Sequence, residues 1–332
     1  MKICVIGAGA MGGAYGGLLA RAGHDVTLVD TWAEHIAAIR ADGLMVEGVA
    51  GEHRVKVRAE TAVPENSKFD VVMVWTDSNN TRQAADAAAK ALGKDGFAIT
   101  MQNGIGNVET LVEVLGKQRV AGGSSMASAA TRGPGRSVLT HMGKTTIGEL
   151  DGKSTKRIED LRDALAAAGF VDVRVHPDIL SVIWSKFALN CTINALCAAT
   201  GLRLGEIARL PAMDRLQDRV IDEVIAVTKA KGLTLEYPDF RGHIKEHCWK
   251  KFSRPSMLQH IESGKRTEIG ALNARLVEEA TKLGVPTPYN DALACLLRGV
   301  EYKRTKAAGL SEADYAALEK KAAHEPAPAR RG

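Results

Sequence analysis

The sequence predicts an α/β fold in two parts: an N-terminal domain built on a parallel β-sheet and an all-helical C-terminal domain. Strand and helix patterns alternate along the first half of the chain, which indicates parallel strands covered by helices on both faces. Strand patterns stop near residue 178, and long stretches of helical periodicity follow. We therefore expect one domain over residues 1–177, a second over 178–310, and a partly disordered tail over 311–332.

The first unit of the chain is a strand, a glycine-rich turn, a helix and a second strand. Apolar and β-branched residues predict the strands over Lys2–Ile6 and Asp25–Asp30. Between them, the motif Gly7-Ala8-Gly9-Ala10-Met11-Gly12 opens a helix of small residues that runs to about Ala22. A G-x-G-x-x-G motif in this position is typical of a Rossmann domain, which binds a dinucleotide.

Each glycine of the motif has a physical task at such a site. Gly7 permits the tight turn, Gly9 lets a pyrophosphate approach the backbone, and Gly12 lets the helix pack closely on the strand. The free N–H groups and the dipole of the helix N-terminus hold the phosphates. We predict a nicotinamide cofactor, NAD(P)H, bound by all six residues of the motif: Gly7, Ala8, Gly9, Ala10, Met11 and Gly12. A loop that served only as a turn would not need the three spaced glycines between a strand and a helix, followed by an acidic residue after the second strand.

Asp30 ends the second strand and bears on which dinucleotide binds. A carboxylate there accepts hydrogen bonds from the adenosine ribose and repels a 2′-phosphate. The next residues, Thr31-Trp32-Ala33, offer no basic side chain for that phosphate. Asp30 therefore favours NAD over NADP. Asp30 also suits the cap of the following helix, a role that does not exclude the first.

Four further strands are expected in the N-terminal domain, over Val55–Ala59, Phe69–Trp75, Phe97–Met101 and Arg119–Ser124. The stretch His141–Gly148 is richer in turns and predicts an antiparallel addition at the edge of the sheet. In the C-terminal domain, helical periodicity predicts four long helices, over Ile179–Thr200, Pro211–Lys231, Leu272–Leu283 and Asn290–Thr305.

The first of these helices carries a polar stripe on an otherwise apolar sequence. Lys186, Asn190 and Asn194 recur every four residues, so they share one face. A partly desolvated lysine has a lowered pKa and can act as a general acid, and asparagine amides can orient a 2-keto acid. The alternative, a solvated helix face, agrees less well with the apolar neighbours of the stripe.

Three other residues are candidates for the same site. Asn103 follows the expected strand Phe97–Met101, where ligands bind in open α/β sheets. Ser256 and Glu268 lie in polar segments of the helical domain. On their own these residues say little, because Asn-Gly often forms a turn and an isolated serine or glutamate is usually at the surface.

Together these segments resemble the ketopantoate reductase (2-dehydropantoate 2-reductase) family over residues 1 to about 305. The resemblance rests on the glycine motif, Gln102-Asn103-Gly104, the Lys186 stripe and the block from Ser256 to Glu268. It implies reduction of ketopantoate to (R)-pantoate, a step of pantothenate biosynthesis toward coenzyme A. It also implies that Lys186 donates the proton and that the substrate is bound by Asn190, Asn194 and Ser256. Asn103 would contact both ligands, and Glu268 would lie near the nicotinamide and the reacting oxygen.

The chain departs from the family pattern in four places. Trp75-Thr76 stands where a lysine is common, and Asp30-Thr31 replaces the basic residue of NADP-dependent members. Leu204 stands in place of an asparagine, and His260 in place of an aspartate. The family habit favours NADP, whereas Asp30 favours NAD. The main alternative is an NAD-dependent D-2-hydroxy-acid dehydrogenase acting on another branched or aromatic 2-keto acid. A regulator that binds the dinucleotide without catalysis would not need the Lys186 stripe.

Composition argues against several other classes. The net charge of +5 is scattered and aromatic residues are only 5%, so no nucleic-acid binding is expected. Five cysteines without a C-x-x-C pair argue against disulfides and a metal site and favour the cytoplasm. No long uncharged apolar run predicts a membrane span. The expected partner is a small 2-keto acid, and the helical domain offers a surface for a homodimer.

Overall fold

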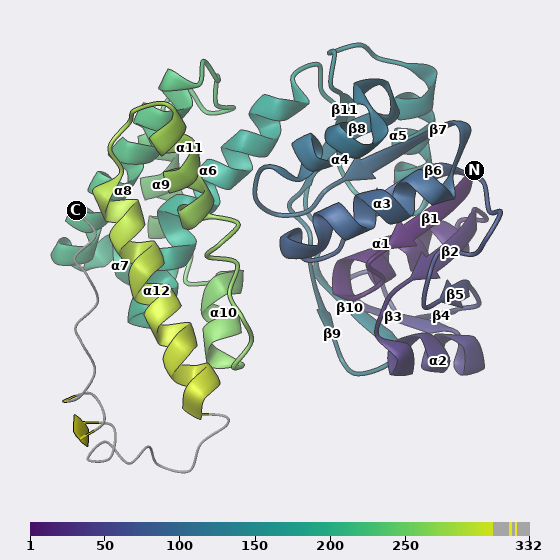
Figure 1. Ribbon diagram of the computed structural model, residues 1–332, viewed down its shortest axis with the longest axis horizontal. Coiled ribbons are helices and arrows are strands. Elements are labelled where there is room, and N and C mark those ends of the chain that lie inside the picture. Colours follow the sequence, from purple (N-terminus) through teal and green to yellow (C-terminus); the bar gives the residue numbers. More distant parts are fainter. Residues whose placement is uncertain (308–318, 321–322, 324–332) are drawn as a thin grey trace.

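The computed structural model describes residues 1–307, 319, 320 and 323. The tail predicted over 311–332 therefore lies outside the described residues, apart from three positions. An α/β domain and a helical domain lie side by side, and the long helix α6 (Ile179–Thr200) leads from one into the other (Figure 1). The predicted fold class, a Rossmann domain with a parallel sheet plus a helical C-terminal part, is confirmed.

Eight strands form the main sheet, in the order β12-β11-β8-β7-β6-β1-β2-β5. The bounds of these strands are β1 Lys2–Ile6, β2 Asp25–Val29, β5 Arg58–Glu60, β6 Phe69–Val74, β7 Leu92–Thr100, β8 Val120–Ser125, β11 Thr145–Glu149 and β12 Val173–Val175. The six strands from β5 to β8 are parallel and have the Rossmann order. The antiparallel addition expected over His141–Gly148 is β11, but the edge of the sheet is the short strand β12.

The N-terminal domain also holds a second, four-stranded sheet that the sequence did not predict, in the order β4-β3-β10-β9. Its strands are β3 Leu44–Gly48, β4 His53–Val55, β9 Ser128–Thr131 and β10 Arg136–His141. The single strand predicted over Val55–Ala59 is wrong. The chain instead forms β4 in the small sheet and then β5 in the main sheet. The local sequence pattern could not show that β4 and β5 belong to different sheets, because the two short strands differ in their pairing partners and not in their composition.

Helix α1 (Ala10–Arg21) is packed between the two sheets, which explains its small residues. A Cβ at Gly16 would lie 2.5 Å from the side chain of Leu28 in the main sheet. A Cβ at Gly17 would lie 2.6 Å from the side chain of Val46 in the small sheet. Larger side chains at these two positions would push the sheets away from the helix that follows the glycine motif.

The remaining helices of the domain cover the main sheet on both faces. Their bounds are α2 Ala33–Asp42, α3 Thr81–Ala91, α4 Asn107–Leu115 and α5 Lys156–Ala167, with 3₁₀ turns at Ser78–Asn80 and Lys117–Arg119. Helices α3 and α4 pack together on the face that carries Cys4, Val72 and Val74 (Figure 1). Apolar residues of α1, α2 and α5 form a separate core on the other face.

The helical domain is organised around α6. The other helices are α7 Leu204–Arg209, α8 Pro211–Ala230, α9 Phe240–Lys250, α10 Ser256–Glu262, α11 Asn273–Lys282 and α12 Pro288–Ala307. Near its start, α6 packs against the main sheet at β8, where a Cβ on Gly122 would lie 3.1 Å from the side chain of Ile183. Further along, Phe187 and Cys191 lie in the core of the helical domain. The stripe of Lys186 is therefore carried by the element that the two domains share.

Among the described residues, α6 is also the one helix long and apolar enough to cross a membrane. Its apolar surface is already used, since 72% of that stretch is buried inside the protein. Such burial is what the central helix of a folded domain requires.

Candidate active site

The glycine motif forms the turn between β1 and α1 with little room to spare. Gly7 has φ +91°, and a Cβ there would lie 2.6 Å from the backbone nitrogen of Thr76. A Cβ on Gly12 would lie 1.9 Å from the carbonyl oxygen of Gly7. Gly9, in contrast, faces open space, since a Cβ there would meet no atom of another part of the chain within 4 Å. The geometry thus leaves an open approach at the N-terminus of α1, where backbone N–H groups favour an anion.

Asp30 lies directly after β2 and has one oxygen already engaged. Its Oδ1 accepts a hydrogen bond from the backbone N–H of Trp32 at 2.9 Å, which steadies the start of α2. Asp30 does not cap the helix itself, because the N-cap of α2 is Trp32 and no side chain bonds to the first free N–H groups of the helix. The second carboxylate oxygen, Oδ2, makes no hydrogen bond to another described residue and remains able to accept one from a ribose hydroxyl.

Lys186 reaches from α6 to the Rossmann domain. Its ammonium Nζ donates a hydrogen bond to the main-chain oxygen of Ser125, at the end of β8, over 2.5 Å. Burial lowers the pKa of Lys186 from its ordinary value of 10.5 to about 8, and the negative charge of Glu268 opposes that shift. A lysine with this pKa is protonated at neutral pH and still gives up its proton readily.

Glu268 and Asn103 join the two domains at the same place. The Asn103 amide donates to both carboxylate oxygens of Glu268, at 3.2 and 3.3 Å, although the residues are 165 positions apart. The main-chain oxygen of Asn103 accepts hydrogen bonds from Ser78 at 2.8 Å and from Asn107 at 3.0 Å. These bonds fix Asn103 just beyond the carboxyl end of β7, at the edge of the sheet where Rossmann domains bind their ligands.

Three further predicted residues lie on the neighbouring helices α6 and α10 without internal partners. Asn194 is 4% exposed, while Asn190 and Ser256 are half-buried. None of the three side chains makes a hydrogen bond to another described residue. Helix α10, which begins at Ser256, packs against α6. Because a buried amide without a partner costs free energy, these groups suit a polar ligand that completes their hydrogen bonds.

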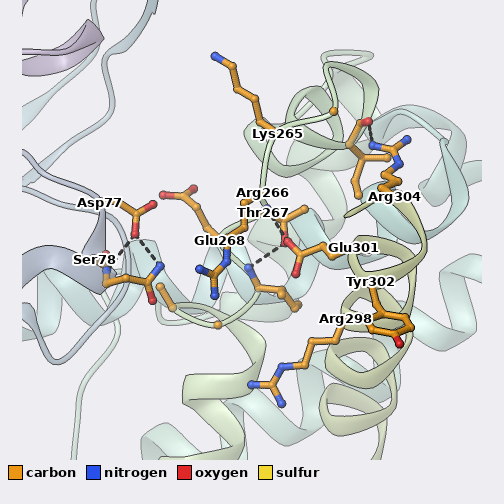
Figure 2. A pocket seen from close by; sticks show the side chains of 16 residues that line it. Asp77, Ser78, Lys265, Arg266, Thr267, Glu268, Arg298, Glu301, Tyr302 and Arg304 are labelled. Carbon is orange, nitrogen blue, oxygen red and sulfur yellow. Dashed lines mark hydrogen bonds between the residues drawn. The ribbon is translucent and has the colours of Figure 1, made fainter. Parts of the chain in front are cut away.

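A cavity of about 630 Å³ lies beside Glu268, between the two domains (Figure 2). Its walls come from the loop Asp77–Asn79, from the segment that carries Glu268, and from α12. Four cationic side chains line it: Lys265, Arg266, Arg298 and Arg304. Lys186 and the asparagines are not part of its lining, and Glu268 is the predicted site residue that faces it. Three carboxylates, Asp77, Glu268 and Glu301, line it as well and largely balance the four cations.

Two family models cover most of the chain. Residues 3–152 match the model described as "Ketopantoate reductase PanE/ApbA", and residues 178–301 match "Ketopantoate reductase PanE/ApbA C terminal". The chain belongs to the ketopantoate reductase family. It is accordingly an oxidoreductase with a nicotinamide cofactor, and the resemblance predicted from the sequence is confirmed.

Individual relatives agree over nearly their whole length. The chain is 33% identical to the 2-dehydropantoate 2-reductase of Pyrococcus abyssi over 301 residues, which is 91% of this chain and 98% of that protein. The crystal structure of a PanE/ApbA family ketopantoate reductase from Ralstonia eutropha JMP134 is 34% identical, with a TM-score of 0.84 and coverage of 92% and 100%. D-mandelate dehydrogenase, in a ternary structure with NADH and anilino(oxo)acetate, is 25% identical, with a TM-score of 0.82 and the same coverage.

The positions that depart from the family pattern have distinct surroundings. Leu204 is 3% exposed at the start of α7 and belongs to the helical core. Trp75 packs on Tyr15, with ring centroids 4.7 Å apart, just beyond the end of β6. His260 has a buried Nδ1 without a hydrogen-bond partner among the described residues.

Sequence reasoning missed the residues that hold the predicted ones in place. Ser125 binds Lys186 through its main-chain oxygen, and its side chain bonds to the hydroxyl of Tyr15 at 2.8 Å. A main-chain acceptor leaves no signal in a sequence, and Tyr15 looks like an ordinary core residue of α1. Within the described part of the chain, no group of three or more His, Cys, Asp or Glu residues could hold a metal ion.

Proposed function

We propose that this protein reduces ketopantoate to (R)-pantoate, with hydride from a nicotinamide dinucleotide and a proton from Lys186. The observation that carries the proposal is the meeting of Lys186, Glu268 and Asn103 between the two domains, beside the carboxyl edge of the sheet. Membership of the ketopantoate reductase family and the names of relatives such as the Pyrococcus abyssi enzyme support the choice of substrate.

A nicotinamide cofactor held at the glycine motif would supply the hydride that the ketone carbon accepts. Lys186 donates its proton from Nζ to the ketone oxygen, which becomes the hydroxyl of the product. The carbonyl of Ser125 keeps the ammonium in place before the transfer and can still accept from the neutral amine afterwards. The negative charge of Glu268 stabilises the protonated lysine, so the acid form is restored from solvent after each turnover.

We assign substrate binding to Asn190, Asn194 and Ser256. Their unpaired amide and hydroxyl groups suit the carboxylate and the hydroxyl of ketopantoate. Asn103 contacts both ligands in this proposal, and Glu268 holds it there. The dinucleotide pyrophosphate binds at Gly7–Gly12, which the open approach at Gly9 supports.

For the cofactor we propose a preference for NAD, since Asp30 has a free oxygen for the ribose and no basic residue stands at positions 31–33. We expect Asp30→Ala to raise the dissociation constant of NADH by about tenfold or more, while that of NADPH stays within about threefold, because the lost bonds are to the ribose diol. Fluorescence titration of both dinucleotides checks this. Equal effects on the two would show that Asp30 does not distinguish them.

One second function has specific support: an NAD-dependent D-2-hydroxy-acid dehydrogenase. The similarity to D-mandelate dehydrogenase with NADH, together with Asp30 and the apolar Leu204, favours it. The test is oxidation of NADH and of NADPH by the purified protein with ketopantoate and with 2-oxo-2-phenylacetate. Faster turnover of ketopantoate supports the first proposal. Turnover of the aromatic acid alone would support the dehydrogenase, with the same roles for Lys186 and the asparagines.

We also propose a homodimer located in the cytoplasm. All five cysteines are free thiols, which suits a reducing compartment. On α12, Leu296 is 62% exposed and Tyr289 is 42% exposed, which suits burial against a second copy. Light scattering of the purified protein tests the assembly, and a monomer at micromolar concentration would contradict it.

A further inference from the structure

A buried histidine outside the site described above is hydrogen-bonded to the main chain of the glycine motif. His35, on α2, is fully buried at 0% exposure. Its Nε2 lies 3.0 Å from the main-chain oxygen of Ala8, the second residue of the motif. Its Nδ1 accepts a hydrogen bond from the backbone N–H of Gly135 at 3.1 Å. Since a backbone N–H can only donate, Nδ1 carries no proton, and Nε2 must be the donor to Ala8.

We propose that His35 is a positioning residue for dinucleotide binding: its single neutral tautomer fixes the orientation of the Ala8–Gly9 peptide. This inference rests on the proposed binding of the dinucleotide at Gly7–Gly12. A trans peptide is planar, and its C=O and N–H point in opposite directions. Anchoring the Ala8 oxygen to His35 therefore turns the N–H of Gly9 away from α2, toward the other side of the loop, and keeps the carbonyl dipole away from an incoming phosphate.

The neighbours of His35 extend the same anchor. The hydroxyl of Ser137, on β10, donates to the main-chain oxygen of Gly9 at 3.3 Å. Gly135 directly precedes β10, so this part of the chain bonds the Gly9 carbonyl through Ser137 and supports the Ala8 carbonyl indirectly, through His35. The second sheet thus helps to keep the glycine motif in place at the N-terminus of α1.

His35 also connects the loop to Asp30. The ring of Trp32 stacks on the ring of His35, with centroids 4.9 Å apart and an angle of 15° between the planes. The N–H of Trp32 is the donor to Asp30. The pyrophosphate loop and the residue that contacts the ribose thus share one buried support. Burial lowers the pKa of His35, against the effects of the Ala8 hydrogen bond and the Asp30 charge, which keeps the ring neutral as the two hydrogen bonds require.

The test compares His35→Ala and His35→Gln. Alanine removes both hydrogen bonds, and we expect the dissociation constant of NADH to rise about 5- to 30-fold, as one or two buried hydrogen bonds would predict. The KM for the cofactor should rise with it, while kcat at saturating NADH stays within about twofold, because the loop lies away from the reacting atoms. Glutamine can donate to Ala8 and accept from Gly135, so it should restore most of the affinity.

His53→Ala is the matched control. His53 also bonds a main-chain oxygen through Nε2, that of Ala50 at 2.7 Å, in the same domain but away from the motif. Its removal should leave NADH affinity unchanged. Ser137→Ala provides a second variant of small volume change, with an expected loss of about two- to fivefold.

Two outcomes would overturn the inference. Wild-type affinity for NADH in both His35→Ala and Ser137→Ala would show that this support of the motif does not act on binding. A fall in kcat together with an unchanged KM for NADH would also contradict it. A wild-type protein that binds neither NADH nor NADPH would instead refute the proposed function, and the inference with it.

Discussion

Lys186 illustrates how the position of one side chain sets its chemistry. Its amine is covered by the α/β domain and bound to a main-chain oxygen, and burial brings its pKa to about 8. If it is the acid, kcat/KM for keto acid reduction should be constant below pH 8. Above that pH it should fall about tenfold per pH unit as Lys186 loses its proton. The pH profile of NADH oxidation measures this.

Substitutions of Lys186 separate its proton from its charge. We expect Lys186→Ala to reduce kcat by roughly 10²–10⁴-fold and to leave dinucleotide binding nearly intact. Lys186→Arg keeps the positive charge but does not titrate in this pH range. The residual activity of this variant should therefore not fall above pH 8. A fully active alanine variant would remove Lys186 from the mechanism.

Tyr15 is expected to act on Lys186 through Ser125. Its hydroxyl bonds to the Ser125 hydroxyl at 2.8 Å and to the Thr145 hydroxyl at 2.7 Å, all in buried positions. Tyr15→Phe should lower kcat by roughly three- to tenfold, because the end of β8 that holds Lys186 loses about one hydrogen bond. NADH affinity should not change. A kcat of Tyr15→Phe equal to that of the wild type would contradict the role of Tyr15.

At the residue scale, the sequence offered candidates for the groups that carry the chemistry and no sign of the groups that support them. Lys186, Asn190 and Asn194 could be found because helical spacing places them on one face. Ser125 acts through its backbone and His35 through partners 27 and 100 positions away, so neither leaves a local pattern.

At the scale of elements, Glu223 shows how α8 fixes the start of α12. It is 7% exposed, and its carboxylate accepts hydrogen bonds from the N–H groups of Tyr289 and Asn290 at 2.8 and 2.9 Å. Glu223→Ala should lower the free energy of unfolding by about 2–4 kcal/mol, since it leaves buried N–H groups unpaired and removes a charge from a helix N-terminus. Urea denaturation measures the change.

The matched control on the same domain is Glu278→Ala. Glu278 pairs with Arg275 on the surface of α11, with side chains 54% and 33% exposed. The free energy of unfolding of Glu278→Ala should be close to that of the wild type, because exposed ion pairs contribute little to stability. If both variants lost the same stability, the effect could not be assigned to the cap of α12.

Long helices were also predicted more accurately than short strands. The helix expected over Ile179–Thr200 has those bounds in α6, because a long apolar stretch lies between a capping Asp178 and a left-handed Gly201. The strands β4 and β5 have three residues each, and two residues separate them. Their assignment to different sheets depends on contacts with β3 and β2, which no local pattern contains.

At the scale of the whole molecule, the site exists only where the two domains meet. The sequence proposed candidate residues for the site, but the distances between them depend on how α6 is placed against β8, which is a tertiary contact. Besides the contacts of Lys186, Glu268 and Asn103, Lys144 and Glu236 form an ion pair across the domains, with Nζ and Oε1 2.9 Å apart and side chains 29% and 24% exposed. The N–H of Glu236 also donates to the hydroxyl of Ser185, the neighbour of Lys186.

This pair should adjust the substrate site without contributing to the binding of the dinucleotide. We expect Lys144→Ala and Glu236→Ala each to raise the KM for the keto acid about two- to fivefold, which corresponds to an ion-pair contribution of about 0.5–1 kcal/mol. The dissociation constant of NADH should stay the same, because the glycine motif lies within one domain. Added salt should reduce the difference between wild type and variants.

A double-mutant cycle decides whether the effect belongs to the pair. If the ion pair sets the domain orientation, the double variant should be no worse than either single one, because the second substitution removes nothing further. Lys156→Ala is the control, since Lys156 pairs with Asp160 within α5 and 85% of its side chain is exposed. Fully additive effects would mean that Lys144 and Glu236 act independently, and that their ion pair does not set the orientation of the domains.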